Sequence, residues 1–461
     1  MVAALNRRSV ALVVVESMFI VGSVATAAGL RPELSRWHEL VRVDAIARGL
    51  LIVGVCQLCL YFNELYDPRQ LVDRRDLFVR ILQAVGSTSA VLAVLYFWFP
   101  DLIIGRGVFF VAAGLVIGVA LVWRTTFEWA SRHVRPRERI LLVGTSPATV
   151  ALAREIHARR VQLGVEITGF VDTDPARVGI SLFNPSIIGV VDDVPRIIRE
   201  RNVDRVVVSL ADARGKLPMQ RLLEMKLSQG VRFDHLASVY EEYTGKIAVE
   251  NLLPSWFIFS HGFRMSDFVR VLKRALDIAL SLAGLLIAAP AMLLVALLVK
   301  LTSPGPILYH QRRVGQGQRV FTIHKFRSMR RDGEADTGAV WAKANDTRLT
   351  PIGRFLRSTR LDELPQLWNV LRGEMSLVGP RPERPEFVSD LSQQIPFYGE
   401  RHVVKPGLTG WAQVRYAYGA SVEDALEKLQ YDLFYIKHMS VAFDLFILFA
   451  TVKTVLLRRG T

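Results

Sequence analysis

The chain has 461 residues, 51% of them hydrophobic, and a formal net charge of +15 at pH 7. This length predicts several domains, and a mean hydropathy of +0.27 argues against both an ordinary soluble protein and a chain that lies wholly within a membrane. The positive charge suits anionic lipid headgroups and phosphorylated substrates, and because the sequence contains no nucleic-acid-binding motif, we expect no nucleic-acid partner.

Four apolar runs open the chain, and each approaches or reaches the length of a membrane-spanning helix. They cover residues 10–30, 45–62, 81–99 and 107–122. Arg7 and Arg8 make the first run resemble a signal peptide, but its length and the three runs that follow favour a retained helix. Basic residues gather before the first run, in the second loop and after the fourth run, so the positive-inside rule places these regions in the cytoplasm. We therefore predict a four-helix transmembrane domain at 1–130.

Two polar features lie inside these runs. Glu16 is a charge within the first run; such a charge is costly in a membrane and can mark a functional site, but it can also reach the interface or pair with a neighbouring helix. Cys56 and Cys59 are the two cysteines of the chain and lie one helical turn apart. No second ligand pair accompanies them, so we predict a packing role rather than a redox or metal site.

A soluble segment follows, in which short apolar strands alternate with helices. Strands are expected at 140–144, 167–171, 187–191 and 203–210. Alternation of this kind is typical of a doubly wound α/β domain, so we assign 131–259 to a Rossmann-like cytoplasmic module. The turn after the first strand has one glycine, Gly144, where a dinucleotide fingerprint needs three, and Asp172 stands where a ribose-binding acid would lie. The sequence leaves open whether this module binds a regulatory nucleotide or is purely structural.

Residues 278–299 form an uncharged apolar run that is interrupted by Pro290. Its length would allow a fifth crossing, but basic residues flank both ends, whereas a crossing helix shows a charge asymmetry. Proline breaks a helix, and the roughly eleven residues after it would extend about 17 Å, too little to cross a core of about 30 Å. We therefore predict a re-entrant hairpin at 273–302, with Pro290 as its break, that enters and leaves on one face.

The candidate site lies at 357–382, in the stretch RSTRLDELPQLWNVLRGEMSLVGPRP. Asp362 and Glu363 precede an apolar helix, which should begin near the proline that follows them. A helix N-terminus binds phosphate and keeps a neighbouring carboxylate ionised, and Arg357 and Arg381 add guanidinium forks for phosphate oxygens. Two carboxylates and fixed guanidiniums suit phosphoryl-group transfer assisted by a hard metal. The alternative is an ordinary acidic first turn, which an isolated Asp-Glu pair would favour.

This stretch also resembles a known family, and the resemblance runs from about Lys273 to the C-terminus. The matching motifs are SPGP at 303–306, KFRSM at 325–329, LDELPQ at 361–366, GPRP at 379–382 and KPGLTGWAQ at 405–413, followed by Asp432 and Tyr435. The chain is thus similar to the bacterial sugar transferases, the polyprenyl-phosphate glycosyl-1-phosphate transferases. It resembles the large multi-spanning members of the exopolysaccharide type, which carry an α/β module between four helices and the transferase domain. We assign that last domain to 260–461.

The resemblance implies an enzyme that moves a sugar-1-phosphate from a UDP-sugar to a polyprenyl phosphate, namely undecaprenyl phosphate, and releases UMP. It implies Mg²⁺ as the cofactor and the bacterial inner membrane as the location, with the catalytic domain on the cytoplasmic face. The product would begin a repeat unit of exopolysaccharide, capsule or O-antigen. Asp362 would form an aspartyl phospho-sugar intermediate and bind the metal; Glu363 would ligate the metal, orient Asp362 or position the acceptor.

Further residues of the matching motifs are expected to contact the phosphates or the substrate. Beside Arg357 and Arg381 these are Lys325, Arg327, Gln413 and Asp432. After Gln413 the chain departs from the family pattern, so the identity of the sugar does not carry over. Anionic membrane lipid is a further expected partner, and the oligomeric state, a homo-oligomer included, is left open.

Two other functions compete with this interpretation. A nucleotide-sugar oxidoreductase or epimerase would need the missing glycines and a Tyr-x-x-x-Lys pair, whereas Lys246 follows Tyr243 at the wrong spacing. A non-catalytic scaffold for polysaccharide assembly is disfavoured by the intact Asp362, Glu363 and Arg381. The predicted fold class is therefore an α/β membrane protein with a four-helix transmembrane bundle, a Rossmann-like doubly wound module and a re-entrant-hairpin α/β transferase domain.

Overall fold

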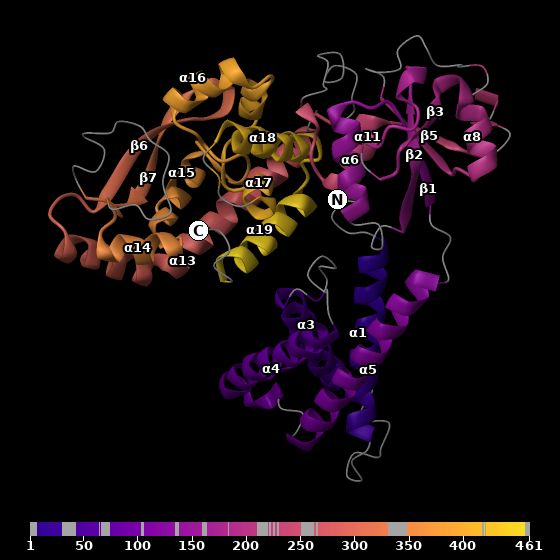
Figure 1. Cartoon of the computed structure of the whole chain (residues 1–461). Helices are drawn as coiled ribbons and strands as arrows, with labels where there is room; N and C mark the ends of the chain where they lie inside the picture. Colours follow the sequence, from indigo (N-terminus) through magenta and orange to yellow (C-terminus); the bar gives the residue numbers. More distant parts are fainter. Residues whose placement is uncertain are drawn as a thin grey trace. The chain divides into compact units, whose positions relative to one another are not determined.

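The computed structural model divides the chain into two compact units, Val2–Leu236 and Ala237–Thr461 (Figure 1). The residues that the structure describes are 7–29, 43–63, 65, 74–102, 106–133, 138–158, 164–182, 184–209, 220, 223–224, 226–227, 230–249, 262–263, 266–330, 348–416, 419 and 421–456.

The four predicted apolar runs all form helices: α1 (Arg7–Gly29), α3 (Val43–Phe62), α4 (Arg74–Trp98) and α5 (Arg106–His133). All four contribute to one apolar core, which includes Ile20, Cys56, Ile81 and Val116. One stretch of these helices, Leu77–Trp98, is long and apolar enough to cross a membrane, and the apolar stretches of the other three are shorter. Length and composition thus make this part of the chain a candidate membrane region.

The polar residues of these helices have structural partners. Glu16 Oε1 lies 2.7 Å from Arg124 Nε of α5, and both side chains are almost fully buried. This ion pair is the pairing with a neighbouring helix that the sequence left open, and it accounts for a charge at this position. Cys56 and Cys59 are free thiols buried in apolar clusters between the helices, which confirms their packing role.

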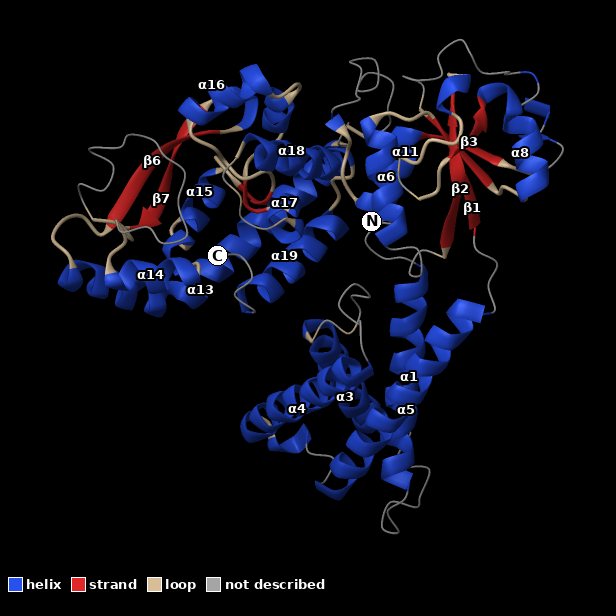
Figure 2. Ribbon diagram, viewed as in Figure 1, coloured by secondary structure: helices blue, strands red, loops and turns tan. Residues whose placement is uncertain are grey.

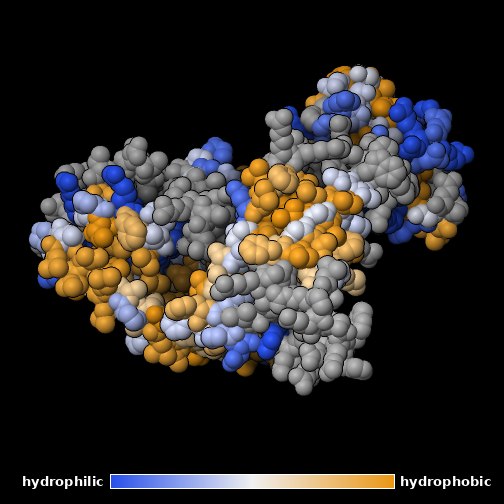
Figure 3. Space-filling model, turned by 90° about the horizontal axis from the view of Figure 1, so that it is seen from below, coloured by the Kyte–Doolittle hydropathy of each residue, from blue (hydrophilic) through white to orange (hydrophobic). Residues whose placement is uncertain are grey.

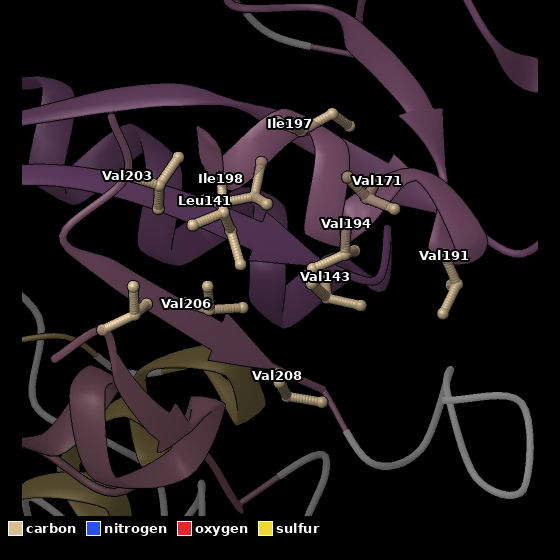
Figure 4. Packing of buried hydrophobic residues seen from close by; sticks show 11 residues of the cluster. Leu141, Val143, Val171, Val191, Val194, Ile197, Ile198, Val203, Val206 and Val208 are labelled. Atoms are coloured by element: carbon tan, nitrogen blue, oxygen red, sulfur yellow. The ribbon is translucent and has the colours of Figure 1, made fainter. Parts of the chain in front are cut away.

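The predicted α/β module contains one parallel sheet in the order β3-β2-β1-β4-β5. Its strands are β1 (Glu138–Val143), β2 (Val165–Asp172), β3 (Ile187–Val190), β4 (Arg205–Val208) and β5 (Arg232–His235). This order is that of a doubly wound nucleotide-binding fold. The helices α6 (Pro147–Ala158) and α8 (Val194–Arg201) accompany it, and apolar side chains of α8 pack onto those of β1, β2 and β4 (Figure 4).

The second unit is built along one long helix, α13 (Asp267–Thr302), which contains Pro290. The predicted helix break is therefore wrong: the helix continues through the proline. Pro290 lies on an exposed side of α13. Both halves of the helix are fixed by packing, which offsets the roughly 3 kcal/mol that an interior proline costs. In the first half Asp277 accepts a hydrogen bond from the Leu377 backbone at 2.9 Å, and in the second half Val299 is buried with Leu356.

Short strands and helices cover one side of α13 (Figure 2). The strands β6 (Leu308–Val314) and β7 (Val320–Phe326) form an antiparallel ribbon, whereas β8 (Ser376–Val378) and β9 (Gly407–Thr409) pair in parallel. The helices are α14 (Pro351–Ser358), α15 (Gln366–Arg372), α16 (Pro385–Gln394), α17 (Trp411–Arg415), α18 (Val422–Lys437) and α19 (Val441–Leu456).

The division between the two units lies upstream of the boundary at 259 that the sequence suggested. The helix α11 (Leu236–Thr244) and the residues after it, to 249, lie almost wholly in the second unit. The sequence pattern places these residues in the α/β module at 131–259.

Candidate active site

The two adjacent carboxylates lie in a single 3-10 turn, η7 (Leu361–Glu363), between α14 and α15. Arg360 sets the direction of this turn, because its φ of +59° is in the left-handed region that side chains other than glycine rarely adopt. Pro365 directly precedes the first residue of α15, so the predicted helix start near the carboxylates is confirmed. The compact turn buries both acids: Asp362 is 5% exposed and Glu363 is 9% exposed.

Glu363 is surrounded by cations. Its Oε1 accepts hydrogen bonds from Lys325 Nζ and Arg381 Nη2, each at 2.9 Å, and Arg360 Nη1 lies 3.9 Å away. Burial alone would raise the pKa of this carboxyl, but Lys325 and Arg381 outweigh burial and hold the pKa well below its usual range. Glu363 is therefore an anion whose charge is already engaged by two of the predicted phosphate-binding cations.

Asp362 has a different environment. Its Oδ1 is buried and has no hydrogen-bond partner among the described residues. Burial, and after it the charge of Glu363, raises the pKa of Asp362 to about 6, while Lys325 and Arg357 act in the opposite direction. Leaving such a buried acceptor unengaged costs about 1–3 kcal/mol, a cost that is common at functional sites. Asp362 is thus the member of the pair that is available to react or to bind a cation.

Arg357 completes the group of charges around the pair. It lies at the end of α14, and its Nε donates to Ser328 Oγ at 3.1 Å. Its charge contributes to the pKa of Asp362. The structure therefore brings together five residues that the sequence singled out: Asp362, Glu363, Lys325, Arg357 and Arg381.

The loop that carries Arg381 is held at both ends. The carbonyl oxygen of Val378 accepts hydrogen bonds from Lys273 Nζ and from Tyr435 Oη, both at 3.0 Å. At the other end, Arg401 Nη2 donates to the carbonyl oxygen of Arg381 at 3.0 Å. These bonds fix the backbone from which the Arg381 guanidinium reaches Glu363.

Three other predicted contact residues have different surroundings. Asp432 is 1% exposed and forms an ion pair with Arg401 at 2.7 Å; burial raises its pKa to about 6 in spite of that pair. Arg327 donates to the carbonyl oxygen of Ser303 at 2.7 Å, at the end of α13. Gln413 lies in α17, and its buried Oε1 has no partner among the described residues. Asp432 and Arg327 thus support the scaffold, and substrate contact by these three residues stays a prediction.

Residues that the sequence analysis missed also shape the site. Arg360 could have been noticed, since it is one more arginine beside the acidic pair. Arg401 and Lys273 gave no local signal, because their acidic partners Asp432 and Asp444 lie 31 and 171 positions away in the chain. Lys273 pairs with Asp444 of α19 at 2.6 Å, so the one acid of the apolar C-terminal helix anchors that helix to the site's scaffold.

A divalent cation fits the Asp362 position, although the protein supplies few ligands. Among the residues that the structure describes, no group of three or more His, Cys, Asp or Glu side chains is placed to hold a metal. Mg²⁺ is commonly bound by one or two carboxylates together with substrate phosphates, so a single unengaged carboxylate oxygen suits it. Asp362 fits this donor set better than Glu363, whose Oε1 is taken by Lys325 and Arg381.

The candidate ribose-binding acid of the α/β module is engaged within its own chain. One oxygen of Asp172 accepts hydrogen bonds from Thr145 Oγ1 and Arg177 Nη1 at 2.7 Å, and the other accepts from the backbone N–H groups of Thr173 and Asp174. These bonds satisfy the carboxylate without a ribose hydroxyl. The site at Asp362 is therefore the stronger candidate for chemistry.

A buried carboxylate pair with one engaged and one available member, ringed by fixed cations beside a long apolar helix, is typical of an enzyme that handles phosphorylated substrates at a membrane. Comparison with known sequences agrees. Residues 268–458 match the bacterial sugar transferase family, and residues 62–224 match a family described as a CoA-binding domain. The chain belongs to the bacterial sugar transferase family, and its relatives are named as undecaprenyl-phosphate sugar phosphotransferases, so it is an enzyme of that class.

Three relatives show the extent of the similarity. A UDP-N-acetylgalactosamine-undecaprenyl-phosphate N-acetylgalactosaminephosphotransferase of Aeromonas hydrophila is 39% identical over 55% of this chain and 59% of its own length. A UDP-glucose:undecaprenyl-phosphate glucose-1-phosphate transferase of Xanthomonas campestris pv. campestris is 34% identical over 76% of this chain and 73% of its own. An exopolysaccharide production protein of Rhizobium leguminosarum bv. phaseoli is 44% identical over 41% of this chain and 96% of its own.

Proposed function

We propose that the protein transfers a sugar-1-phosphate from a UDP-sugar to undecaprenyl phosphate in two displacements at Asp362. In the first, an Asp362 carboxylate oxygen attacks the phosphorus that bears the sugar, the bond from that phosphorus to UMP breaks, and UMP leaves. In the second, an oxygen of the lipid phosphate attacks the same phosphorus and the bond to Asp362 breaks. The products are a sugar linked to the lipid by a diphosphate and the free carboxylate.

The observation that carries this proposal is the contrast between the two adjacent acids. A nucleophile needs an oxygen that no cation holds, and the buried Oδ1 of Asp362 has no hydrogen-bond partner among the described residues. Glu363 is engaged by Lys325 and Arg381. A donor diphosphate that enters the site would compete for these cations, so Glu363 holds them in place until the substrate arrives.

Mg²⁺ is part of the proposal. Held by Asp362 and the donor's phosphates, it would neutralise the charge of the diphosphate. Arg357 and Arg381 would bind phosphate oxygens, since guanidinium forks match their geometry. Gln413 offers its unengaged amide oxygen to a donor group of the nucleotide or the sugar.

The placement of α13 supports a site on one face of the membrane. Lys273 and Asp277, near its start, bind the same unit that buries Val295 and Val299 near its end. A helix that crossed the bilayer would have its two ends on opposite sides of a core about 30 Å thick. A single compact unit that packs on both ends of α13 is incompatible with such a crossing. The outward side of α13 is apolar, with Leu286, Ile287, Leu293, Leu294 and Leu301 all more than half exposed, and Figure 3 shows hydrophobic surface over this part of the molecule.

We therefore infer that α13 is embedded from the cytoplasmic face as one unbroken helix. As in the predicted hairpin, both ends of the segment lie on the cytoplasmic face. Unlike the predicted hairpin, the segment is a single helix without a break at Pro290. The arrangement lets a water-soluble UDP-sugar and a membrane-bound lipid phosphate reach Asp362 together. In view of the relatives' functions, the product would begin an exopolysaccharide, capsule or O-antigen repeat unit.

Release of UMP tests the proposal. The purified protein, with undecaprenyl phosphate and Mg²⁺, is offered a panel of UDP-sugars that includes UDP-glucose and UDP-N-acetylgalactosamine, the donors named for the relatives. We expect release of UMP from at least one donor. Without the lipid phosphate, each protein molecule should release no more than one UMP, because only the first displacement can occur. A protein that releases no UMP from any donor, although it is folded, would contradict the assignment.

A further inference from the structure

A short segment upstream of the shared transferase region is docked on the catalytic unit. Residues 237–249, here called the docking segment, comprise α11 from its second residue and the five residues after it. They precede the family match, which begins at residue 268, and follow the CoA-binding match, which ends at 224. The docking segment therefore lies outside both family matches.

The first contact is ionic. Glu241 of the docking segment is buried, and its carboxylate accepts a hydrogen bond from Lys437 Nζ at 2.7 Å and contacts the His438 ring nitrogen. Lys437 and His438 lie at the C-terminal end of α18. Removing one member of this buried group is costly, because the remaining charges would stay buried without their partner.

The second contact runs through Trp411, the first residue of α17. Its indole Nε1 donates to the carbonyl oxygen of Gly245 at 2.9 Å, and the residue is only 2% exposed. Gly245 has a φ of +70°, so the turn that brings this carbonyl to the indole favours glycine. The docking segment thereby provides the hydrogen-bond partner of a buried indole.

The third contact is made by the residues that follow this glycine. Lys246 Nζ forms an ion pair with Glu427 at 2.6 Å and lies 5.7 Å from the centre of the Tyr431 ring. The Ile247 N–H donates to the carbonyl oxygen of Gln430 at 3.1 Å. Val239, Ile247 and Val249 are almost completely buried. The segment thus uses ionic, backbone and apolar contacts together, as a packed element does.

These contacts lead toward the catalytic pair through neighbouring elements. The strand β9 ends at Thr409, two residues before Trp411, and the carbonyl oxygen of Thr409 accepts a hydrogen bond from the Gly379 N–H at 2.9 Å. The Gly407 N–H donates in turn to the carbonyl oxygen of Pro380 at 2.8 Å. Gly379 and Pro380 are the residues directly before Arg381, which binds Glu363.

We propose that the docking segment positions the transferase site: docked, it fixes Trp411 and, through β9, the loop that carries Arg381. This inference rests on the proposed function. The Rhizobium relative has 96% of its length in an alignment of 192 residues, about the length of the transferase match at 268–458, and we therefore expect the shared fold to form without this segment. Its release is therefore expected to slow turnover without unfolding the unit. Because α11 follows β5 directly in the chain, the docking segment is also the covalent link from the α/β module to the transferase unit.

A charge swap in the full-length protein tests this proposal. Glu241→Lys places a cation against Lys437 and His438 and should release the segment. Glu242→Lys makes the same charge change at an exposed neighbouring position and is the matched control. The double variant Glu241→Lys with Lys437→Glu restores one ion pair in the opposite sense. Two readouts are taken: hydrogen exchange of residues 237–249 and 411–415 without substrate, and UMP release.

We expect Glu241→Lys to speed exchange in both segments and to slow UMP release about tenfold, within the usual range of coupling between sites. The control should change neither quantity, and the double variant should recover most of both. Faster exchange in 237–249 with unchanged exchange in 411–415 and an unchanged rate would overturn the proposal. So would a double variant that stays as slow as the single one.

A second variant covers the case in which Glu241→Lys fails to fold. Trp411→Phe removes the indole N–H and keeps an aromatic ring in place. We expect faster exchange in 237–249 and a rate a few-fold lower; a wild-type rate and wild-type exchange would also overturn the proposal. If the unmodified protein released no UMP, the proposed function would fail, whereas the exchange results would still decide whether 237–249 and 411–415 are coupled.

Discussion

Asp362 and Glu363 are neighbours in the chain, yet their environments give them opposite properties. Glu363 accepts hydrogen bonds from Lys325 and Arg381, whereas the buried Oδ1 of Asp362 has no partner within the part of the chain that the structure describes. The residue pattern predicts the pair and its cations, but the role of nucleophile came to Asp362 only from the family resemblance, because the two acids are adjacent in the chain. Side-chain direction within the 3-10 turn makes the difference.

The first prediction is that Asp362→Asn abolishes the chemistry while keeping the shape. The amide has no anionic oxygen to attack phosphorus, so turnover should fall by about 10³-fold or more, as for other lost nucleophiles. A UDP-sugar labelled in its sugar should leave a covalent label on Asp362 in the unmodified protein and none in the variant, as seen by peptide mass spectrometry. Glu363→Gln is expected to be slow as well, but to retain the label at Asp362. UMP release by Asp362→Asn at the normal rate would exclude the covalent mechanism.

The pH dependence of the rate gives the second prediction. Asp362 attacks only when ionised, and its pKa is raised to about 6, so the rate should fall as the pH drops through about 6. The negative charge of Glu363 raises this pKa, and the charge of Lys325 lowers it. The acid limb should therefore move to lower pH in Glu363→Gln and to higher pH in Lys325→Met. The residual rate of each variant is measured across pH 4.5–8; limbs that do not move, or move in the opposite directions, would contradict the assignment of the limb to Asp362.

At the scale of elements, the long helix α13 shows where the sequence prediction was right and where it was wrong. The charges flanking residues 278–299 favoured a helix that stays on one side, and the packing of both its ends on one unit supports that view. The break at Pro290 did not follow, because the packing of both halves of the helix on the same unit offsets the backbone hydrogen bond that the proline removes and its clash with the preceding turn. Pro290 lies on the exposed side, a fact that no local pattern reveals.

The third prediction concerns this topology. In a protein whose Cys56 and Cys59 have been replaced by alanine, single cysteines are placed at Arg270 and Thr302, which are exposed near the two ends of α13. Both should react with a membrane-impermeant thiol reagent from the cytoplasmic side only, in inside-out vesicles but not in intact cells. Pro290→Leu should leave this pattern largely unchanged, since the packing of both ends, rather than the proline alone, holds the helix on one face. Reaction of position 302 from the periplasmic side in the unmodified Pro290 background would show a crossing helix and remove Asp362 from the cytoplasm.

At the scale of the whole molecule, the order of the parts followed from the sequence because apolar runs and alternating strands are local patterns. The four helices and the strands β1 to β4 appear where periodicity placed them. The strand β5 was not predicted, because Phe233 is the only apolar residue among its four. The pairs Arg401–Asp432 and Lys273–Asp444 were not predicted either, because they join distant parts of the chain, and chain proximity is the main signal that one sequence offers.

The boundary between the parts was the least predictable feature, and it yields the last prediction. A transferase unit that begins near Phe259 keeps every residue assigned to chemistry, but it loses the docking segment, and with it the partners of Trp411, Glu427 and Lys437. Burial of Val239, Ile247 and Val249 alone stabilises the unit by about 1.5–3 kcal/mol for each side chain, as an upper estimate.

Two shortened proteins, one beginning at Leu236 and one at Phe259, therefore differ only in this segment and the residues that follow it. In detergent, the longer protein should release UMP at close to the full-length rate, since the four helices and the α/β module contribute no catalytic residue. The shorter protein should remain active but about tenfold slower and should melt at a lower temperature. Equal rates and equal melting temperatures would show that the segment adds nothing to the unit. A longer protein that is folded but inactive would instead show that residues before Leu236 take part in the site itself.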